Sequence, residues 1–82
     1  MTRLRYWAAA KEAAGVAEES VQAATLAEAL GAARAGHDER FATVLARCSF
    51  VVDGDPVGGR DHGRVGVRPD SLVDVLPPFA GG

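Results

Sequence analysis

The residues of this sequence that are suited to chemistry lie together in its last segment, Pro77-Pro78-Phe79-Ala80-Gly81-Gly82. Consecutive prolines hold a chain extended, and Ala-Gly-Gly has so little side-chain bulk that it fits a narrow channel in a partner protein. The reactive group is then the α-carboxylate of Gly82. Because a carboxylate is a poor electrophile and the chain carries no ATP-binding motif, a partner must adenylate Gly82 before a sulfur or nitrogen nucleophile attacks it.

Length and composition limit what the rest of the chain can do. Its 82 residues, 48% of them hydrophobic and 24% charged, predict a single soluble domain, 1–82, with a flexible tail from about 77. A net charge of −2 argues against a general nucleic-acid binder. The one cysteine excludes an internal disulfide framework and a cysteine-rich zinc site, and two isolated histidines argue against a metal enzyme. Without a membrane-length apolar run or a signal peptide, we expect a cytoplasmic carrier or binding module.

The elements that must position the last segment follow from periodicity and turn residues. In chain order we expect a strand at 3–6, a short helix at 8–14, a strand at 19–23, the main helix to about 35, a helical turn after 38, strands at 49–52 and 55–57, a loop at 58–63, a turn at 68–70 and a last strand at 72–76. The class is therefore α+β, with a mixed sheet of four or five strands and one main helix packed on one face.

Local motifs set the ends of these elements. Thr25-Leu26-Ala27-Glu28 is a capping box that starts the main helix, and Gly36 has the position of a left-handed residue that ends it. Asp53-Gly54 predicts a tight turn between two strands. Pro77-Pro78 ends the last strand because proline has no N–H to donate.

Alternation assigns the strand residues to two faces of the sheet. In the first strand Leu4 and Tyr6 face the core, whereas Arg3, Arg5 and Trp7 face outward. In the last strand the residues that face outward are Leu72, Asp74 and Leu76. We expect Arg3 and Arg5 to be solvated charges, the alternative being ion pairs with acidic groups of a partner.

Segments across nearly the whole chain resemble the MoaD/ThiS-type ubiquitin-like sulfur carriers, and most closely the small subunits of molybdopterin synthase. They are LRYWA (4–8), TLAEAL (25–30), FVVDGDPV (50–57) and DSLVDVLPPFAGG (70–82). The last segment is the specific one. The chain departs from the family in being shorter between Phe41 and Phe50, and in having Asp53 where the family usually has asparagine.

The resemblance implies a β-grasp fold and a mechanism. An E1-like adenylating enzyme (MoeB-type) uses ATP to activate Gly82, and a persulfide sulfur converts the adenylate to a thiocarboxylate. The tail then enters the large molybdopterin synthase subunit (MoaE-type), where its sulfur attacks a cyclic pterin precursor. In this scheme the chain binds no cofactor itself and is not catalytic alone; Gly82 carries the sulfur, and Gly81 gives passage.

The resemblance also implies a partner surface. The first and last strands of a β-grasp sheet are neighbours, which places Trp7 and Leu76 in one exposed apolar patch beside the tail. Pro56 matches a family position on the same surface, and the tail adds Pro77, Phe79 and Ala80. An exposed apolar patch commonly marks an interface. The alternative is that Trp7 folds over residues 8–14 as part of the core.

Other functions stay open at this point. The same tail chemistry serves carriers for thiazole or cysteine synthesis, and a protein modifier, in which a lysine amine attacks the adenylate. The third class is a passive interaction domain with a chance Gly-Gly end.

Four further features of the sequence carry no function in our interpretation. Residues 58–63 lack the Lys-Ser/Thr of a phosphate-binding loop, and Cys48 is expected to be a small buried hydrophobe. His37 and His62 are expected to be exposed and incidental.

Overall fold

A computed structural model gives the structure of the chain and describes residues 1–78. In chain order the elements are β1 (Thr2–Tyr6), α1 (Ala8–Ala14), β2 (Glu18–Val21), α2 (Leu26–Ala35), α3 (Glu39–Leu45), β3 (Ser49–Val52), β4 (Asp55–Pro56), the 3₁₀ turn η1 (His62–Arg64) and β5 (Leu72–Leu76). The four predicted tail residues Phe79, Ala80, Gly81 and Gly82 lie outside the described part.

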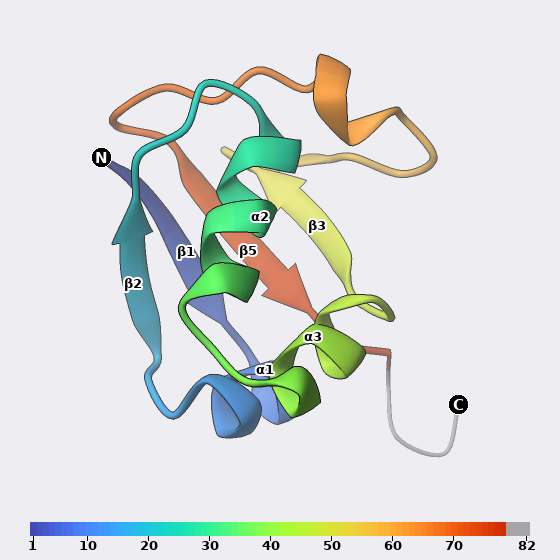
Figure 1. Cartoon of the computed structure of the whole chain (residues 1–82). Helices are drawn as coiled ribbons and strands as arrows, with labels where there is room; N and C mark the ends of the chain where they lie inside the picture. Colours follow the sequence, from blue (N-terminus) through green and yellow to red (C-terminus); the bar gives the residue numbers. More distant parts are fainter. Residues whose placement is uncertain (79–82) are drawn as a thin grey trace.

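The five strands form one mixed sheet in the order β2-β1-β5-β3-β4. β1 and β5 are parallel, and the other neighbours are antiparallel. Helix α2 lies across one face, while α1 and α3 lie at the end of the sheet where β1 and β5 finish (Figure 1). This is the predicted α+β class, with the ubiquitin-like β-grasp arrangement of a helix on a mixed sheet.

Helix α2 begins as its capping box predicts. The Thr25 hydroxyl accepts from the Glu28 N–H, and the Glu28 carboxylate reaches back to accept from the Ala24 N–H. The end of the helix differs from the prediction, because Gly36 has a φ of −92° and not a left-handed value. Its N–H bonds to the carbonyl of Ala33 in the last helical turn, so glycine's conformational freedom is not used there.

The strand predicted at 19–23 ends earlier, at Val21, because the chain changes partner. Ala24 accepts from the N–H of Val67, and Thr25 forms an antiparallel bridge with Gly66. These contacts draw the chain away from β1 and toward the segment that precedes β5. The short strand predicted at 55–57 likewise ends one residue earlier, at Pro56.

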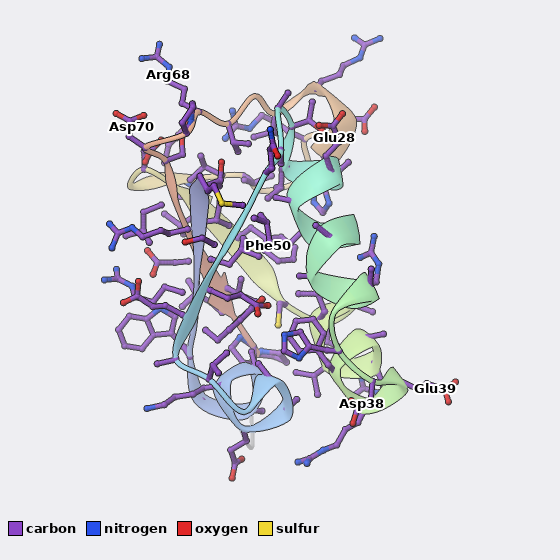
Figure 2. All side chains as sticks on the ribbon, turned by 60° about the vertical axis from the view of Figure 1, so that its left-hand side comes forward. Glu28, Asp38, Glu39, Phe50, Arg68 and Asp70 are labelled. Carbon is purple, nitrogen blue, oxygen red and sulfur yellow. The ribbon has the colours of Figure 1, made fainter. Side chains whose placement is uncertain are left out.

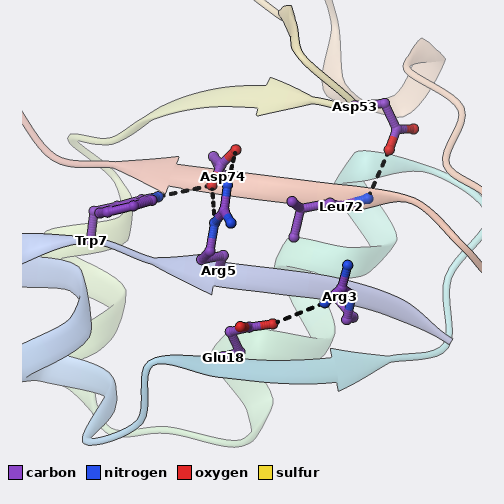
Figure 3. Close-up of polar contacts among 7 residues, drawn as sticks. All are labelled: Arg3, Arg5, Trp7, Glu18, Asp53, Leu72 and Asp74. Atoms are coloured by element: carbon purple, nitrogen blue, oxygen red, sulfur yellow. Dashed lines mark hydrogen bonds and ion pairs between the residues drawn. The ribbon is translucent and has the colours of Figure 1, made fainter.

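The turn between β3 and β4 is the tight turn that Asp53-Gly54 predicts. Both residues have positive φ values, 51° for Asp53 and 82° for Gly54, as a type I′ hairpin turn requires. Asp53 also ties the turn to β5, because its carboxylate accepts from the N–H of Leu72 at 2.9 Å (Figure 3). The family's usual asparagine is therefore replaced by a residue that fills the same conformation.

The core lies between α2 and the sheet, and the predicted inward residues of the first and last strands are all buried there: Leu4, Tyr6, Val73 and Val75. From β3, Phe50 lies in the layer between the sheet and α2 (Figure 2).

The expectation that both histidines are exposed is wrong. His37 Nε2 lies 2.7 Å from Glu19 Oε1, and its ring packs 4.5 Å from that of Phe41. His62 packs edge-on against Phe50 at 5.3 Å. His37 thereby fastens the α2–α3 connection to β2, and His62 fastens η1 to the core.

Candidate functional site at the base of the tail

The parallel pairing of β1 and β5 brings the end of the first strand beside the start of the tail. Leu4 is opposite Val73, and Tyr6 is opposite Val75. The Trp7 N–H extends this pairing by bonding to the Val75 carbonyl at 3.2 Å. The strand order therefore places Trp7 next to the point at which the chain leaves the sheet.

A groove of about 700 Å³ lies at this point, and we call it the tail-base groove. Its lining is mostly apolar and consists of Trp7, Ala8, Ala9, Glu12, Ser49, Leu76, Pro77 and Pro78. Trp7 is 45% exposed, so the alternative in which it folds into the core is wrong. The predicted neighbours Trp7, Leu76 and Pro77 are brought together here, next to the tail segment.

Pro56 lies on the same open face of the sheet but not in the groove. Pairing across the sheet places Pro56 opposite Val51, Val51 opposite Asp74, and Asp74 opposite Arg5. Pro56 is thus at the β4 edge, outside the residues that line the tail-base groove.

Three side chains on this face form a compact polar arrangement, shown in Figure 3. Arg5 donates to both carboxylate oxygens of Asp74, through Nε at 2.7 Å and Nη2 at 3.2 Å. Trp7 donates from Nε1 to Asp74 Oδ1 at 2.8 Å. The guanidinium carbon of Arg5 also lies 5.1 Å from the centre of the Trp7 ring, a cation–π distance.

These contacts change the acid–base properties of the arrangement. The hydrogen bonds from Arg5, and after them the one from Trp7, hold the pKa of Asp74 below its ordinary value despite partial burial. The bond to Asp74 likewise raises the pKa of Arg5. Asp74 is therefore a carboxylate, and not a proton donor, at neutral pH.

Arg3 is a solvated charge as expected, because its side chain is 55% exposed and makes only a 3.4 Å surface contact with the exposed Glu18 of β2. The expectation is wrong for Arg5, which pairs with the largely buried Asp74 at 2.7 Å. Asp74 is a site residue that the sequence does not predict. Alternation placed it on the outer face, but its place opposite Arg5 depends on the register of two strands that lie far apart in the chain.

The described part of the chain offers little other chemistry. Between residues 1 and 78, no group of three His, Cys, Asp or Glu side chains is arranged to hold a metal ion. Cys48 is half-buried and donates to the carbonyl of Val44, and burial raises the pKa of its thiol. Among the helices of residues 1–78, none has the length and apolar character that spanning a membrane requires.

Fold and groove together define a ubiquitin-like β-grasp domain with an apolar surface at the base of its C-terminal segment. Residues 4–82 match the ThiS family, and the chain belongs to that family. No curated protein matches the chain closely enough to be counted as a relative.

Three solved structures illustrate the shared fold. Small archaeal modifier protein 1 from Methanosarcina acetivorans is 14% identical, with 99% of this chain and 95% of that chain covered and a TM-score of 0.83. The same-named protein from Haloferax volcanii is 20% identical, with 99% and 98% covered and a TM-score of 0.81. Subunit 1 in the complex of molybdopterin-converting factor subunits 1 and 2 from Helicobacter pylori is 18% identical, with 99% and 97% covered and a TM-score of 0.71.

Proposed function

We propose that this chain is a sulfur carrier whose reactive group is the α-carboxylate of Gly82. The observation that carries the proposal is the family match, which extends through the Gly-Gly segment to residue 82. The tail-base groove supports it, because a mostly apolar surface lies where the chain leaves β5 for that segment. A partner that takes up the tail can therefore also bind the groove at the base of the tail.

The chemistry requires two steps outside the chain. The Gly82 carboxylate attacks the α-phosphate of ATP in an activating enzyme, which forms the acyl adenylate and releases pyrophosphate. The terminal sulfur of a persulfide then attacks the acyl carbon and AMP leaves. A thiol cleaves the resulting acyl disulfide, and the sulfur remains on Gly82 as a thiocarboxylate.

The sulfur acceptor in this proposal is a cyclic pterin precursor held by a large molybdopterin synthase subunit. The Helicobacter pylori neighbour is a complex of molybdopterin-converting factor subunits 1 and 2, which supports a partner of that kind. Trp7, Leu76 and Pro77 would contact that partner at the groove. Phe79 would pack at the mouth of its channel, and Ala80 and Gly81 would lie inside the channel. Pro56 would contact it at the other edge of the same face.

The test is the intact mass of the purified chain after incubation with ATP, an activating enzyme of this family and sulfide. In this assay sulfide replaces the persulfide: it attacks the acyl carbon of the adenylate, AMP leaves, and the thiocarboxylate forms directly. We expect a mass increase equal to the replacement of one oxygen by sulfur, dependent on ATP. A variant that lacks Gly81 and Gly82 should show no increase. An unchanged mass, under conditions that convert a known carrier, would overturn the proposal.

A second candidate is a protein modifier, and two structural neighbours carry that name. It shares the adenylation step, but a lysine amine of a target protein then attacks the acyl carbon. Covalent adducts of higher mass that contain the chain, found in cell extract, would favour this candidate. Their absence together with the sulfur mass increase would favour the carrier.

A further inference from the structure

We infer that Asp74 and Arg5 are positioning residues that immobilise the indole of Trp7 at the side of the tail-base groove. The activating enzyme then binds an indole whose orientation is already fixed. The inference rests on the proposed function and adds to it the residues that prepare the docking surface. Neither residue touches a reacting atom, so neither is catalytic.

Two contacts hold the Trp7 indole, one at the edge of its ring and one over the face of the ring. Its Nε1 donates to Asp74 at 2.8 Å, and the guanidinium of Arg5 lies over the ring at 5.1 Å. Arg5 also donates twice to the same carboxylate, so Asp74 cannot rotate away without losing three hydrogen bonds. The Asp74 side chain is only 17% exposed, which limits the competition from water.

The backbone of Trp7 is fixed as well. Its N–H bonds to Val75 of β5, and its carbonyl accepts from Ala10 and Lys11 in the first turn of α1. Ala8, the next residue, has a φ of 47°, so the chain turns sharply into the helix. With the backbone held between β5 and α1, the two side-chain torsions of Trp7 are its remaining freedom, and the contacts to Asp74 and Arg5 restrict them.

An exposed aromatic side chain that is already immobile loses little conformational entropy on binding. Trp7 is 45% exposed, so a partner can reach it, yet its orientation is set before the partner arrives. Removing the hydrogen bond from Trp7 to Asp74 should therefore weaken binding of the activating enzyme to the chain roughly three- to tenfold. This is the usual effect of one side chain that must be ordered on binding.

The reach of the tail requires any enzyme that acts on Gly82 to bind at the groove. We assign the groove to the activating enzyme because adenylation is the first step of the proposed reaction, and the large synthase subunit would bind the same surface only after the activating enzyme has left. Pro78 lines the groove, and only four residues follow it up to Gly82. Four residues span at most about 14 Å. An enzyme that takes the Gly82 carboxylate into its active site must therefore bring its own surface close to the groove.

The experiment measures ATP–pyrophosphate exchange by a family activating enzyme as the concentration of the chain is varied. For Asp74→Ala we expect the KM for the chain to rise roughly three- to tenfold with kcat unchanged. Asp74→Asn keeps an oxygen that accepts from Trp7, so its rise should be smaller. Glu18→Ala is the matched control, because it removes the Arg3–Glu18 pair and the carboxylate opposite Arg5 but leaves the hydrogen bonds of Asp74 to Arg5 and Trp7 in place.

A double mutant tests whether Asp74 acts through Trp7. Trp7→Ala should raise KM at least as much as Asp74→Ala, and adding Asp74→Ala to Trp7→Ala should then have no further effect. Because the chain has one tryptophan, the decay of its fluorescence anisotropy reports the mobility of the indole, and fast local motion should increase in Asp74→Ala but not in Glu18→Ala.

The inference is overturned if the KM of Asp74→Ala equals that of Glu18→Ala, or if the two single effects add in the double mutant. Asp74→Asn is nearly isosteric and keeps the inference testable if Asp74→Ala fails to fold. Absence of exchange with the unaltered chain would instead contradict the proposed function and, with it, the assigned occupant. The anisotropy measurement would then still decide whether Asp74 fixes the indole.

Discussion

At the scale of single residues, the central group on the open face of the sheet is the carboxylate of Asp74. It is ionised at neutral pH and hydrogen-bonded to its neighbours, so it is neither a proton donor nor a free charge. Asp74 accepts three hydrogen bonds, and the side chains that supply them come from the first strand and the residue after it. We infer that Asp74 has a positioning role, because it holds the exposed indole of Trp7 beside the start of the tail.

The lowered pKa of Asp74 makes this arrangement sensitive to acid in a defined direction. A carboxyl group whose folded pKa lies below its unfolded value stabilises the fold above the unfolded pKa and loses that effect as pH falls through the folded pKa. Tryptophan emission should therefore stay constant down to about pH 4 and change only below it. A transition above that range would contradict the assignment, and Asp74→Asn should abolish the acid transition.

Cys48 provides a second prediction at this scale. Its thiol donates to the carbonyl of Val44, and burial raises its pKa, so the nucleophilic thiolate is scarce at neutral pH. Cys48→Ala should therefore gain sulfur at Gly82 as fast as the unaltered chain when followed by intact mass. Loss of the mass increase in a folded Cys48→Ala protein would show that Cys48 carries sulfur during the reaction.

At the scale of elements, the hairpin turn between β3 and β4 connects local conformation to the last strand. Asp53 has a φ of 51° and accepts from the N–H of Leu72 at 2.9 Å. Asp53→Ala should lower the free energy of unfolding by about 1–2 kcal/mol, because it removes this bond and fits the left-handed region less well. Urea denaturation measures the change.

The control for this prediction is Asp53→Asn, which keeps an acceptor oxygen and tolerates the left-handed conformation. It should stay within about 0.5 kcal/mol of the unaltered chain. A loss as large as that of Asp53→Ala would show that the negative charge, and not the turn conformation, is what matters at this position.

Elements whose ends depend on local motifs could be predicted from the sequence. Thr25 caps α2, and Asp53-Gly54 forms the turn between β3 and β4, each through the conformation of a few neighbouring residues. The end of β2 could not be predicted, because it depends on the pairing of Ala24 with the distant Val67.

The same limit applies to the side chains of the site. The outward direction of Trp7 follows from alternation along one strand, and it is confirmed. The pairing of Arg5 with Asp74 requires the register between β1 and β5, which no local pattern contains. His37 was missed for the same reason, because its partner Glu19 lies on another element.

At the scale of the whole molecule, the parallel β1–β5 pair connects fold to function. It places the end of the first strand, with Trp7, beside the end of the last strand, from which the tail departs. The small chain thus has an apolar groove next to the segment that we propose to be reactive. In this proposal the enzymes that act on that segment supply the catalytic groups.

Sulfur addition at Gly82 can be followed on the tryptic peptide that contains this residue. Because Pro69 follows Arg68 and blocks cleavage there, that peptide runs from Val65 to Gly82, and it contains neither cysteine nor methionine. After incubation with ATP, activating enzyme and sulfide, we predict that this peptide gains one sulfur in place of one oxygen and that fragmentation places it on Gly82. No gain of sulfur on this peptide, under conditions that convert a known carrier, would contradict the proposed function.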